Sequence, residues 1–239
     1  MTIHNAEEKE TVRRVISSGN EELDSKMGGG IPVGSVTLIE GGSGSGKSVL
    51  SQQIIWGSLE QGFKASVFTS ENTVKSLVKQ MQSIELDVLD YLLLGRLRIY
   101  PMELSRLGER ATKTLLSAMQ RETDRDILVI DSFTSAVIHA PDEQQIIAFF
   151  EGCKRLSAEG TSVIVVLHSD AVEADFINPI RAMCDADLQL RSEQDGQRLV
   201  KTLQVAKIRG AASVTGAIVG FDVEPGWGMR VIPISKARG

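Results

Sequence analysis

The chain has 239 residues, of which 26 are Lys or Arg and 31 are Asp or Glu, so its formal charge is −5. This acidic balance argues against a protein whose main task is to coat nucleic acid or an anionic membrane. The longest apolar run, at 163–167, is far shorter than the ~20 residues of a membrane span, and the polar N-terminus does not resemble a secretory signal. We therefore expect a soluble, cytoplasmic protein whose two cysteines stay reduced.

Short β-branched segments alternate with helical patterns through the first two thirds of the chain, which is typical of a parallel α/β sheet. Helices are predicted at 48–60, 73–84, 104–119 and 145–156. Strands are predicted at 34–40, 65–69, 97–100, 127–130 and 162–167.

The pattern changes after about residue 185, where strands at 188–190 and 199–208 flank Asp195-Gly196, a hairpin signal. Two more strands, at 214–223 and 229–234, flank turn residues at 224–226. The expected fold class is α/β, a mostly parallel central sheet flanked by helices and followed by a C-terminal antiparallel meander. Because no linker interrupts this pattern, we expect a single domain over 1–239, with 1–11 as a flexible tail.

A glycine-rich segment at 41–48, GGSGSGKS, fits the P-loop (Walker A) pattern G-x-x-x-x-G-K-[ST] at every fixed position. It lies between a predicted strand and a predicted helix, which is the context that the pattern requires. Glycines let successive N–H groups point at phosphates, Lys47 adds positive charge, and the Ser48 hydroxyl reaches Mg²⁺. We therefore predict ATP and Mg²⁺ as ligands, with contacts from Gly42, Ser43, Gly44, Ser45, Gly46, Lys47, Ser48 and Val49.

Two acidic residues end predicted strands at the carboxyl edge of the sheet, where open α/β sheets bind their ligands. Asp131 is predicted to hold Mg²⁺ together with Ser48, or else to cap the helix that follows. Glu71 is the candidate catalytic residue: it either faces the γ-phosphate and orients the attacking water, or caps the helix that begins near Thr73.

Three further residues carry two interpretations each. His168, which follows the strand at 162–167, either senses the γ-phosphate or is a hydrogen-bonded residue at the junction. Lys207 and Arg209 alternate along a strand and therefore share one face. They either form a solvated basic face or reach the phosphates of a neighbouring subunit in trans, as arginine fingers do.

Residues 14–48, RVISSGNEELDSKMGGGIPVGSVTLIEGGSGSGKS, resemble the opening of KaiC-type ATPase domains of the RecA superfamily. The resemblance covers the chain from about Val12 onward. Segments at 48–62, 127–135, 184–216 and 223–237 resemble, more narrowly, the ArlH (FlaH) family of KaiC-like ATP-binding proteins of the archaellum, the archaeal flagellum.

This resemblance implies a RecA-like fold and a homo-oligomeric ring, expected to be a hexamer, with Lys207 and Arg209 acting in trans at the subunit interface. It implies as partners the motor ATPase ArlI (FlaI), the platform protein ArlJ (FlaJ) and cytoplasmic scaffold proteins, and hence a peripheral place at the cytoplasmic face of the membrane. KaiC domains commonly carry two adjacent glutamates where this chain has Glu71-Asn72. That departure predicts slow or absent hydrolysis.

The leading hypothesis is an ATP-binding regulatory and assembly subunit of the archaellum motor complex, in which nucleotide controls oligomerisation and binding to the motor ATPase. The alternative is an active ATPase or a KaiC-like autokinase, so the sequence leaves open whether the protein is an enzyme. A RecA-type DNA recombinase is disfavoured, because the charge is acidic and no basic loop is interleaved with aromatic residues; we expect no nucleic-acid partner.

Overall fold

One large sheet runs through the residues that the computed structural model describes, which are 14–195, 198–209, 215–224 and 228–233. The tail predicted at 1–11 lies outside them. The strands of this sheet are β3 (Val36–Gly41), β4 (Ala65–Thr69), β5 (Leu97–Pro101), β6 (Ile127–Asp131), β7 (Ser162–His168), β8 (Ala186–Asp195), β9 (Arg198–Ile208), β10 (Ile218–Glu224) and β11 (Gly228–Ile232). Their spatial order is β11-β10-β9-β8-β3-β7-β6-β4-β5.

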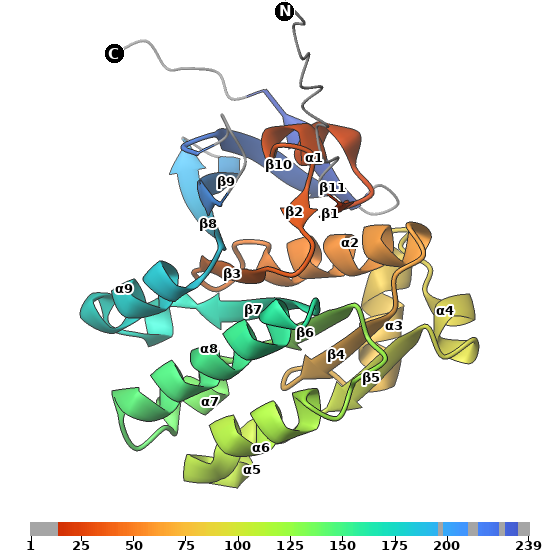
Figure 1. Cartoon of the computed structure of the whole chain (residues 1–239). Coiled ribbons are helices and arrows are strands. Elements are labelled where there is room, and N and C mark those ends of the chain that lie inside the picture. Colours follow the sequence, from red (N-terminus) through yellow and green to blue (C-terminus); the bar gives the residue numbers. More distant parts are fainter. Residues whose placement is uncertain (1–13, 196–197, 210–214, 225–227, 234–239) are drawn as a thin grey trace, which may run out of the picture.

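Helices cover both faces of this sheet, and a small antiparallel pair, β1 (Val15–Ile16) and β2 (Ile31–Pro32), precedes it (Figure 1). The helices are α1 (Glu21–Lys26), α2 (Lys47–Glu60), α3 (Val74–Ser83), α4 (Leu89–Leu93), α5 (Leu104–Leu107), α6 (Ala111–Met119), α7 (Thr134–Ile138), α8 (Glu143–Ala158) and α9 (Ala174–Met183), with short 3₁₀ turns η1 (Gly108–Arg110) and η2 (Ser169–Ala171).

The predicted fold class is confirmed by the pairing of the strands. The strands from β8 to β5 in the spatial order are all parallel, whereas β8, β9, β10 and β11 form an antiparallel meander. Asp195 pairs with Arg198 and Glu224 with Gly228, as the two turn signals predict. The turn residues 196–197 and 225–227 themselves lie outside the described residues.

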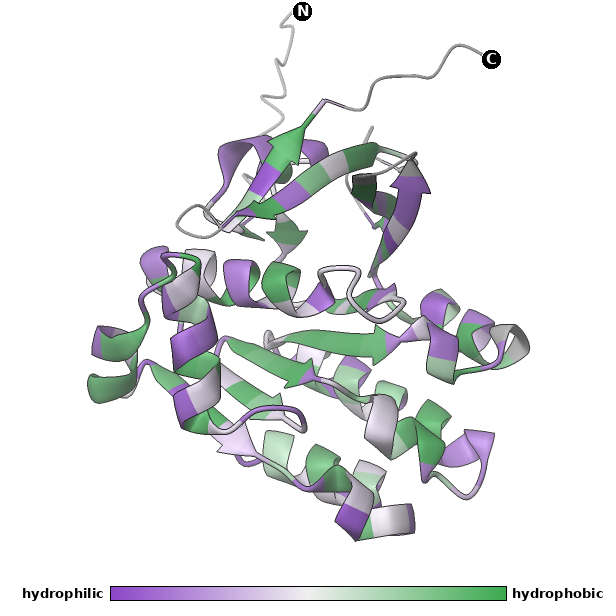
Figure 2. Cartoon of the chain, turned by 180° about the vertical axis from the view of Figure 1, so that it is seen from behind, coloured by the Kyte–Doolittle hydropathy of each residue, from purple (hydrophilic) through white to green (hydrophobic). Residues whose placement is uncertain are grey.

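The central strands are apolar because both of their faces are buried. Every residue of β3, β4 and β6 is buried, and Figure 2 shows these strands as hydrophobic while the outer helices are mixed. One apolar cluster lies between the sheet, α2, α3 and the meander, and a second lies beneath α6, α8 and α9. Both clusters hold β3 in place, and β3 ends at the start of the predicted P-loop.

Several elements differ from the sequence prediction. The single helix predicted at 104–119 is wrong: it is broken into α5, η1 and α6 at Gly108, where φ is 54°. The short helices α1, α4, α7 and α9 were not predicted, because a five- or six-residue helix has too few turns to show a period and α9 contains Pro179.

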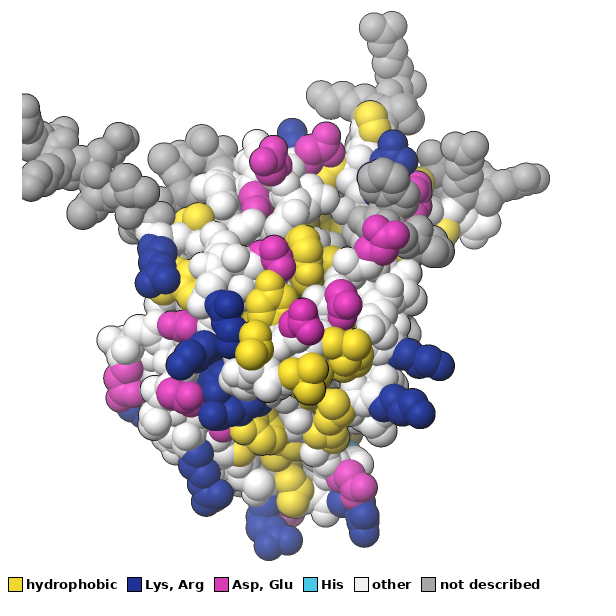
Figure 3. Space-filling view, turned by 90° about the vertical axis from the view of Figure 1, so that its right-hand side faces the viewer, with side chains coloured by type: hydrophobic (Ala, Val, Ile, Leu, Met, Phe, Trp, Pro, Cys, Tyr) yellow, Lys and Arg dark blue, Asp and Glu magenta, His cyan; other side chains and the backbone are white. Residues whose placement is uncertain are grey.

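Short α4 leaves leucines at the surface. The exposed fractions of Leu93 and Leu94 are 83% and 74%, and hydrophobic side chains gather on this side of the molecule in Figure 3. Within the described ranges, no helix combines the length and the apolar composition needed to cross a lipid bilayer.

Candidate functional site

The P-loop segment leaves β3 at Gly41 and enters α2 at Lys47, as predicted. Gly44 and Gly46 adopt positive φ angles of 71° and 100°, which residues other than glycine rarely adopt. A Cβ on Gly46 would also lie 2.9 Å from the Phe221 ring. Glycine is therefore required at the turn into α2 both for its backbone angle and for the packing of the meander.

Lys47 is folded back onto the loop that precedes it. Its Nζ donates to the carbonyl oxygen of Gly42 at 2.6 Å, and only 3% of the residue is exposed. Burial lowers the pKa of Lys47, while the charges of Glu71, Asp131 and Asp170 act in the opposite direction. The lysine is thus a buried cation on which the charges of three carboxylates act.

Asp131 lies at the end of β6, next to the first turn of α2. Its carboxylate accepts from Ser51 Oγ at 3.1 Å and lies 3.5 Å from Ser48 Oγ. Burial, and after it the charge of Glu71, raises the pKa of Asp131 to about 6. The helix-cap alternative for Asp131 is wrong, because the N-cap position of α7 is Phe133. Ser51 was missed by the sequence reasoning, although its spacing of three from Ser48 places both on one helix face.

Glu71 contacts two residues at the ends of neighbouring strands. Ser132 Oγ donates to Glu71 Oε1 at 2.8 Å, and His168 Nε2 lies 3.1 Å from the same oxygen. His168 is therefore a hydrogen-bonded junction residue whose side chain also faces the site. No signal in the sequence pointed to Ser132.

The capping alternative for Glu71 is wrong. Thr73 caps α3 instead, since its Oγ1 accepts from the backbone N–H of Ser76 at 3.1 Å. The neighbouring Asn72 also turns toward α3, where its Oδ1 accepts from Ser76 Oγ and Gln80 Nε2.

A cavity of about 320 Å³ opens over these residues. It is lined by Ser43, Gly44, Gly46, Lys47, Ser48, Val49, Glu71, His168, Lys201 and Val223. Gly42 and Ser45, which were predicted as contacts, line a neighbouring cavity instead. Lys201 and Val223 come from β9 and β10, and the sequence gives no sign that the meander reaches the P-loop.

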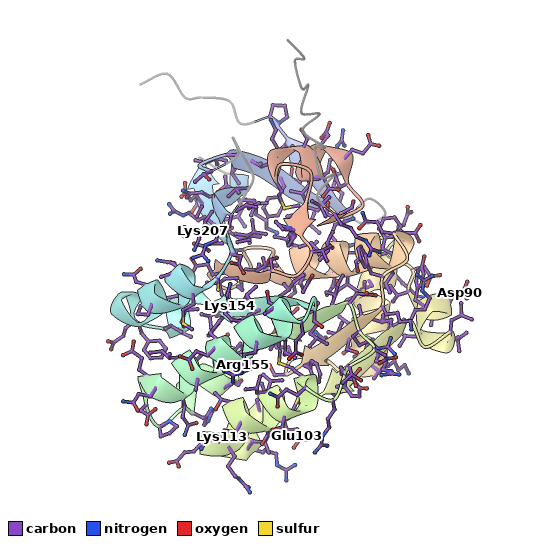
Figure 4. All side chains as sticks on the ribbon, in the orientation of Figure 1. Asp90, Glu103, Lys113, Lys154, Arg155 and Lys207 are labelled. Carbon is purple, nitrogen blue, oxygen red and sulfur yellow. The ribbon has the colours of Figure 1, made fainter. Side chains whose placement is uncertain are left out.

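Lys207 and Arg209 lie elsewhere, at the end of α9. Lys207 Nζ donates to the carbonyl oxygens of Arg181 and Cys184, and both side chains reach the carbonyl oxygen of Ala182. Arg209 Nη1 also donates to Asp185 Oδ1 at 3.1 Å. Figure 4 places Lys207 on the side that carries α9 and β8. The two cations share one face, as predicted, and neither is among the residues that line the P-loop cavity.

Comparisons with known proteins bear on this arrangement. A family model of the KaiC ATPases matches residues 16–236. The archaeal flagellar ATP-binding protein FlaH of Sulfolobus acidocaldarius is 34% identical over 94% of this chain and 99% of its own. The chain belongs to the FlaH family of KaiC-like ATPases.

A solved structure of a FlaH protein has the fold described above. The crystal structure of the flagellar accessory protein FlaH from Methanocaldococcus jannaschii covers 93% of this chain and 100% of its own, with a TM-score of 0.81 at 24% identity. The circadian clock oscillator protein KaiC of Synechococcus elongatus is 26% identical over 91% of this chain, which corresponds to 44% of KaiC. The RecA-like fold and the family resemblance stated from the sequence are thereby confirmed.

Proposed function

We propose that this FlaH-family chain is an ATP-binding regulatory and assembly subunit of the archaellum motor complex, with slow or absent hydrolysis. Nucleotide occupancy sets its self-association into a ring and its affinity for the motor ATPase. The observation that carries the proposal is the P-loop itself: Lys47 lies buried at the start of α2, below a cavity that the loop glycines line.

The phosphates of ATP are bound, in this proposal, by backbone N–H groups of 42–49 and by Lys47. The lysine leaves the carbonyl oxygen of Gly42 and turns its charge to the β- and γ-phosphates. Ser48 and Asp131 fit Mg²⁺, since both present oxygen atoms on neighbouring elements at the same edge of the sheet. Mg²⁺ would supply charge neutralisation between the phosphates when bound.

Slow turnover is supported by the contacts of Glu71 and by the neutral residue, Asn72, that follows it. Glu71 shares its Oε1 with Ser132 and His168, and the next residue is a neutral amide that hydrogen-bonds to α3. Only the other carboxylate oxygen of Glu71, Oε2, is without a partner among the described residues and can orient a water molecule. An active ATPase is the second candidate, because Glu71 lines the same cavity as Lys47 and Ser48 and its Oε2 is available.

The assembly context comes from the family. The relatives are named archaeal flagellar ATP-binding proteins, which supports a place in the archaellum assembly. We propose as partners the motor ATPase ArlI, the platform protein ArlJ and the cytoplasmic scaffold. We propose that the chain acts as one domain, held by the continuous sheet, and that it meets the membrane only through this complex.

ATP binding and phosphate release test the proposal together. We expect the wild type to bind a fluorescent ATP analogue and to release phosphate more slowly than the ~1 s⁻¹ at the low end of ordinary enzymes. Lys47→Ala should weaken binding by about a hundredfold or more, because the triphosphate loses its principal cation. Lys75→Ala, at an exposed lysine on α3, is the matched control and should bind normally.

Two results would contradict the proposal. Near-normal affinity of Lys47→Ala would remove the P-loop as the nucleotide site. Rapid phosphate release by the wild type would show that the chain is a working ATPase and not a regulatory subunit with slow turnover.

A further inference from the structure

A carboxylate from another part of the chain lies against the P-loop. Asp170, in the η2 turn after β7, accepts the backbone N–H of Ser43 through Oδ2 at 3.3 Å. The same oxygen lies only 2.7 Å from the position that a Cβ on Gly42 would occupy. Any side chain at residue 42 would therefore meet this carboxylate.

The contact places a negative charge where P-loop amides receive phosphate. Backbone N–H groups of such loops, together with the start of the following helix, attract anions whatever their chemical origin. The carboxylate of Asp170 is one of the three that surround Lys47, and its charge raises the pKa of that lysine against the effect of burial. A carboxylate of the chain itself thus occupies a backbone N–H group of the loop that would otherwise attract a phosphate.

We propose that Asp170 is an internal competitor for phosphate at the P-loop, which a bound nucleotide must displace. The inference rests on the proposed function, since it deepens the account of the same site. Removing the charge of Asp170 strengthens nucleotide binding, and the effect grows with the number of phosphates on the ligand.

The surroundings provide a place for the displaced carboxylate. A cavity of about 490 Å³ lies beside the contact and is lined by Ser43, Asp170, Arg181 and Arg191 among others. The lining also includes two acids, Glu40 and Glu193, and Arg181 is already paired with Glu40. Arg191 is therefore the lining cation that favours a carboxylate that has left the loop. Asp170 lies in the segment that joins His168, which contacts Glu71, to α9, where carbonyl oxygens accept from Lys207 and Arg209.

The test compares Asp170→Asn with the wild type in calorimetric titrations with ATP, ADP and AMP at low salt. Asparagine keeps an oxygen that accepts the Ser43 N–H, so the substitution isolates the charge. We expect Asp170→Asn to bind ATP about five- to twentyfold more tightly, with a smaller gain for ADP and little for AMP, and the gains to shrink at high salt. Glu173→Gln removes an exposed charge from the same loop and is the matched control.

A second measurement needs no nucleotide. Hydrogen exchange of the Ser43 amide should be faster in Asp170→Ala than in the wild type, because the acceptor is gone. Unchanged or weaker ATP binding by Asp170→Asn, or a gain that Glu173→Gln reproduces, would overturn the inference. Absence of nucleotide binding by the wild type would instead overturn the proposed function, and the exchange rate at Ser43 would still decide whether Asp170 holds the loop.

Discussion

At Glu71 the site carries a carboxylate with one oxygen already engaged. Oε1 serves both Ser132 and His168, and these two residues come from the ends of different strands, β6 and β7. Both contacts fix the rotation of the carboxyl group, so Oε2 alone remains to meet a water molecule. If Glu71 orients the attacking water, as proposed, it does so through that single oxygen.

Glu71→Gln should lower phosphate release more than it changes ATP affinity. Glutamine keeps an oxygen for Ser132 and His168 but cannot take a proton, so we expect a loss of about a hundredfold in release and a change of no more than about threefold in affinity. Single-turnover assays with saturating ATP measure the first quantity and equilibrium titration the second. If binding is lost while the rate for each bound site stays the same, Glu71 is a structural residue.

Buried carboxylates below the P-loop make stability depend on pH. Glu40, which precedes the loop, is paired with Arg181 at 2.7 Å, and Asp187 lies beside this pair. Burial, and after it the charge of Glu40, raises the pKa of Asp187 to about 6. An acid whose pKa is raised by folding destabilises the folded state once it ionises, so this part of the stability is present below pH 4 and is lost as the pH rises through 6.

Asp187→Asn should remove that loss. We expect the free energy of unfolding of the variant, relative to the wild type, to rise between pH 4 and pH 7.5 by on the order of 2 kcal/mol. Urea denaturation at a series of pH values measures it. A difference that does not vary with pH would show that Asp187 ionises in the folded chain as easily as in the unfolded one.

At the level of elements, α2 is held by the loop that follows β1 as well as by the sheet. A Cβ on Gly57 would lie 2.3 Å from the backbone nitrogen of Gly19 and 2.5 Å from the carbonyl oxygen of Ser17. Backbone atoms cannot move aside as a side chain does. The helix that begins at the P-loop is thus fixed at a point far from its phosphate-facing end.

Gly57→Ala should destabilise the protein, although alanine favours helices more than glycine does. We expect a loss of about 3 kcal/mol in the free energy of unfolding, because the methyl group overlaps backbone atoms. Gly152→Ala in α8 is the comparison. The three atoms nearest to its Cβ all belong to the side chain of Leu116, which can change rotamer, so its loss should be smaller. Chemical denaturation of both variants measures the two losses, and equal losses would contradict this account of the packing.

The sequence predicted those elements and site residues whose cause is local. The sequence identified in this way the strands with buried β-branched residues, the P-loop, and Asp131, the acid that ends β6. Ser132 and Asp170 were not, because their roles come from residues 61 and 127 positions away, across the sheet edge. Gly108 was assigned to a helix interior because nothing nearby in the sequence shows that φ there is positive.

At the scale of the whole molecule, the segment with Lys207 and Arg209 is tied to α9 and to Asp185. Arg209 donates to Asp185 Oδ1 and to the carbonyl oxygen of Ala182, and its side chain is 54% exposed. Lys154, from α8, binds the same Asp185 at 2.8 Å. Substituting Arg209 or Lys154 with alanine therefore removes one positive charge in each case, but from different elements of the chain.

ATP should promote self-association of the wild type, and Arg209→Ala should blunt that response. If the arginine reaches the phosphates of a neighbour, association and ATP binding are coupled by the ~1–3 kcal/mol typical of such linkage. Lys154→Ala should respond to ATP as the wild type does. Sedimentation velocity across a nucleotide series measures the response, and identical profiles for Arg209→Ala and the wild type would eliminate the trans contact.

The position of β3 in the sheet also sets when the nucleotide site can form during synthesis. β3 pairs on one side with β7 and on the other with β8. Residues 36–41 pair with 163–168 of β7, and residues 37–41 pair with 186–190 of β8. Until residue 190 has left the ribosome, the strand that carries the P-loop lacks its complete β8 neighbour. Backbone N–H and C=O groups on that edge are then unpaired, and such edges attract other strands. The cavity at the P-loop also takes lining residues from β7, β9 and β10, so the complete site forms only after these strands have been made. Before that point, the earlier strands of the nascent chain have no complete nucleotide site through which ATP would stabilise them.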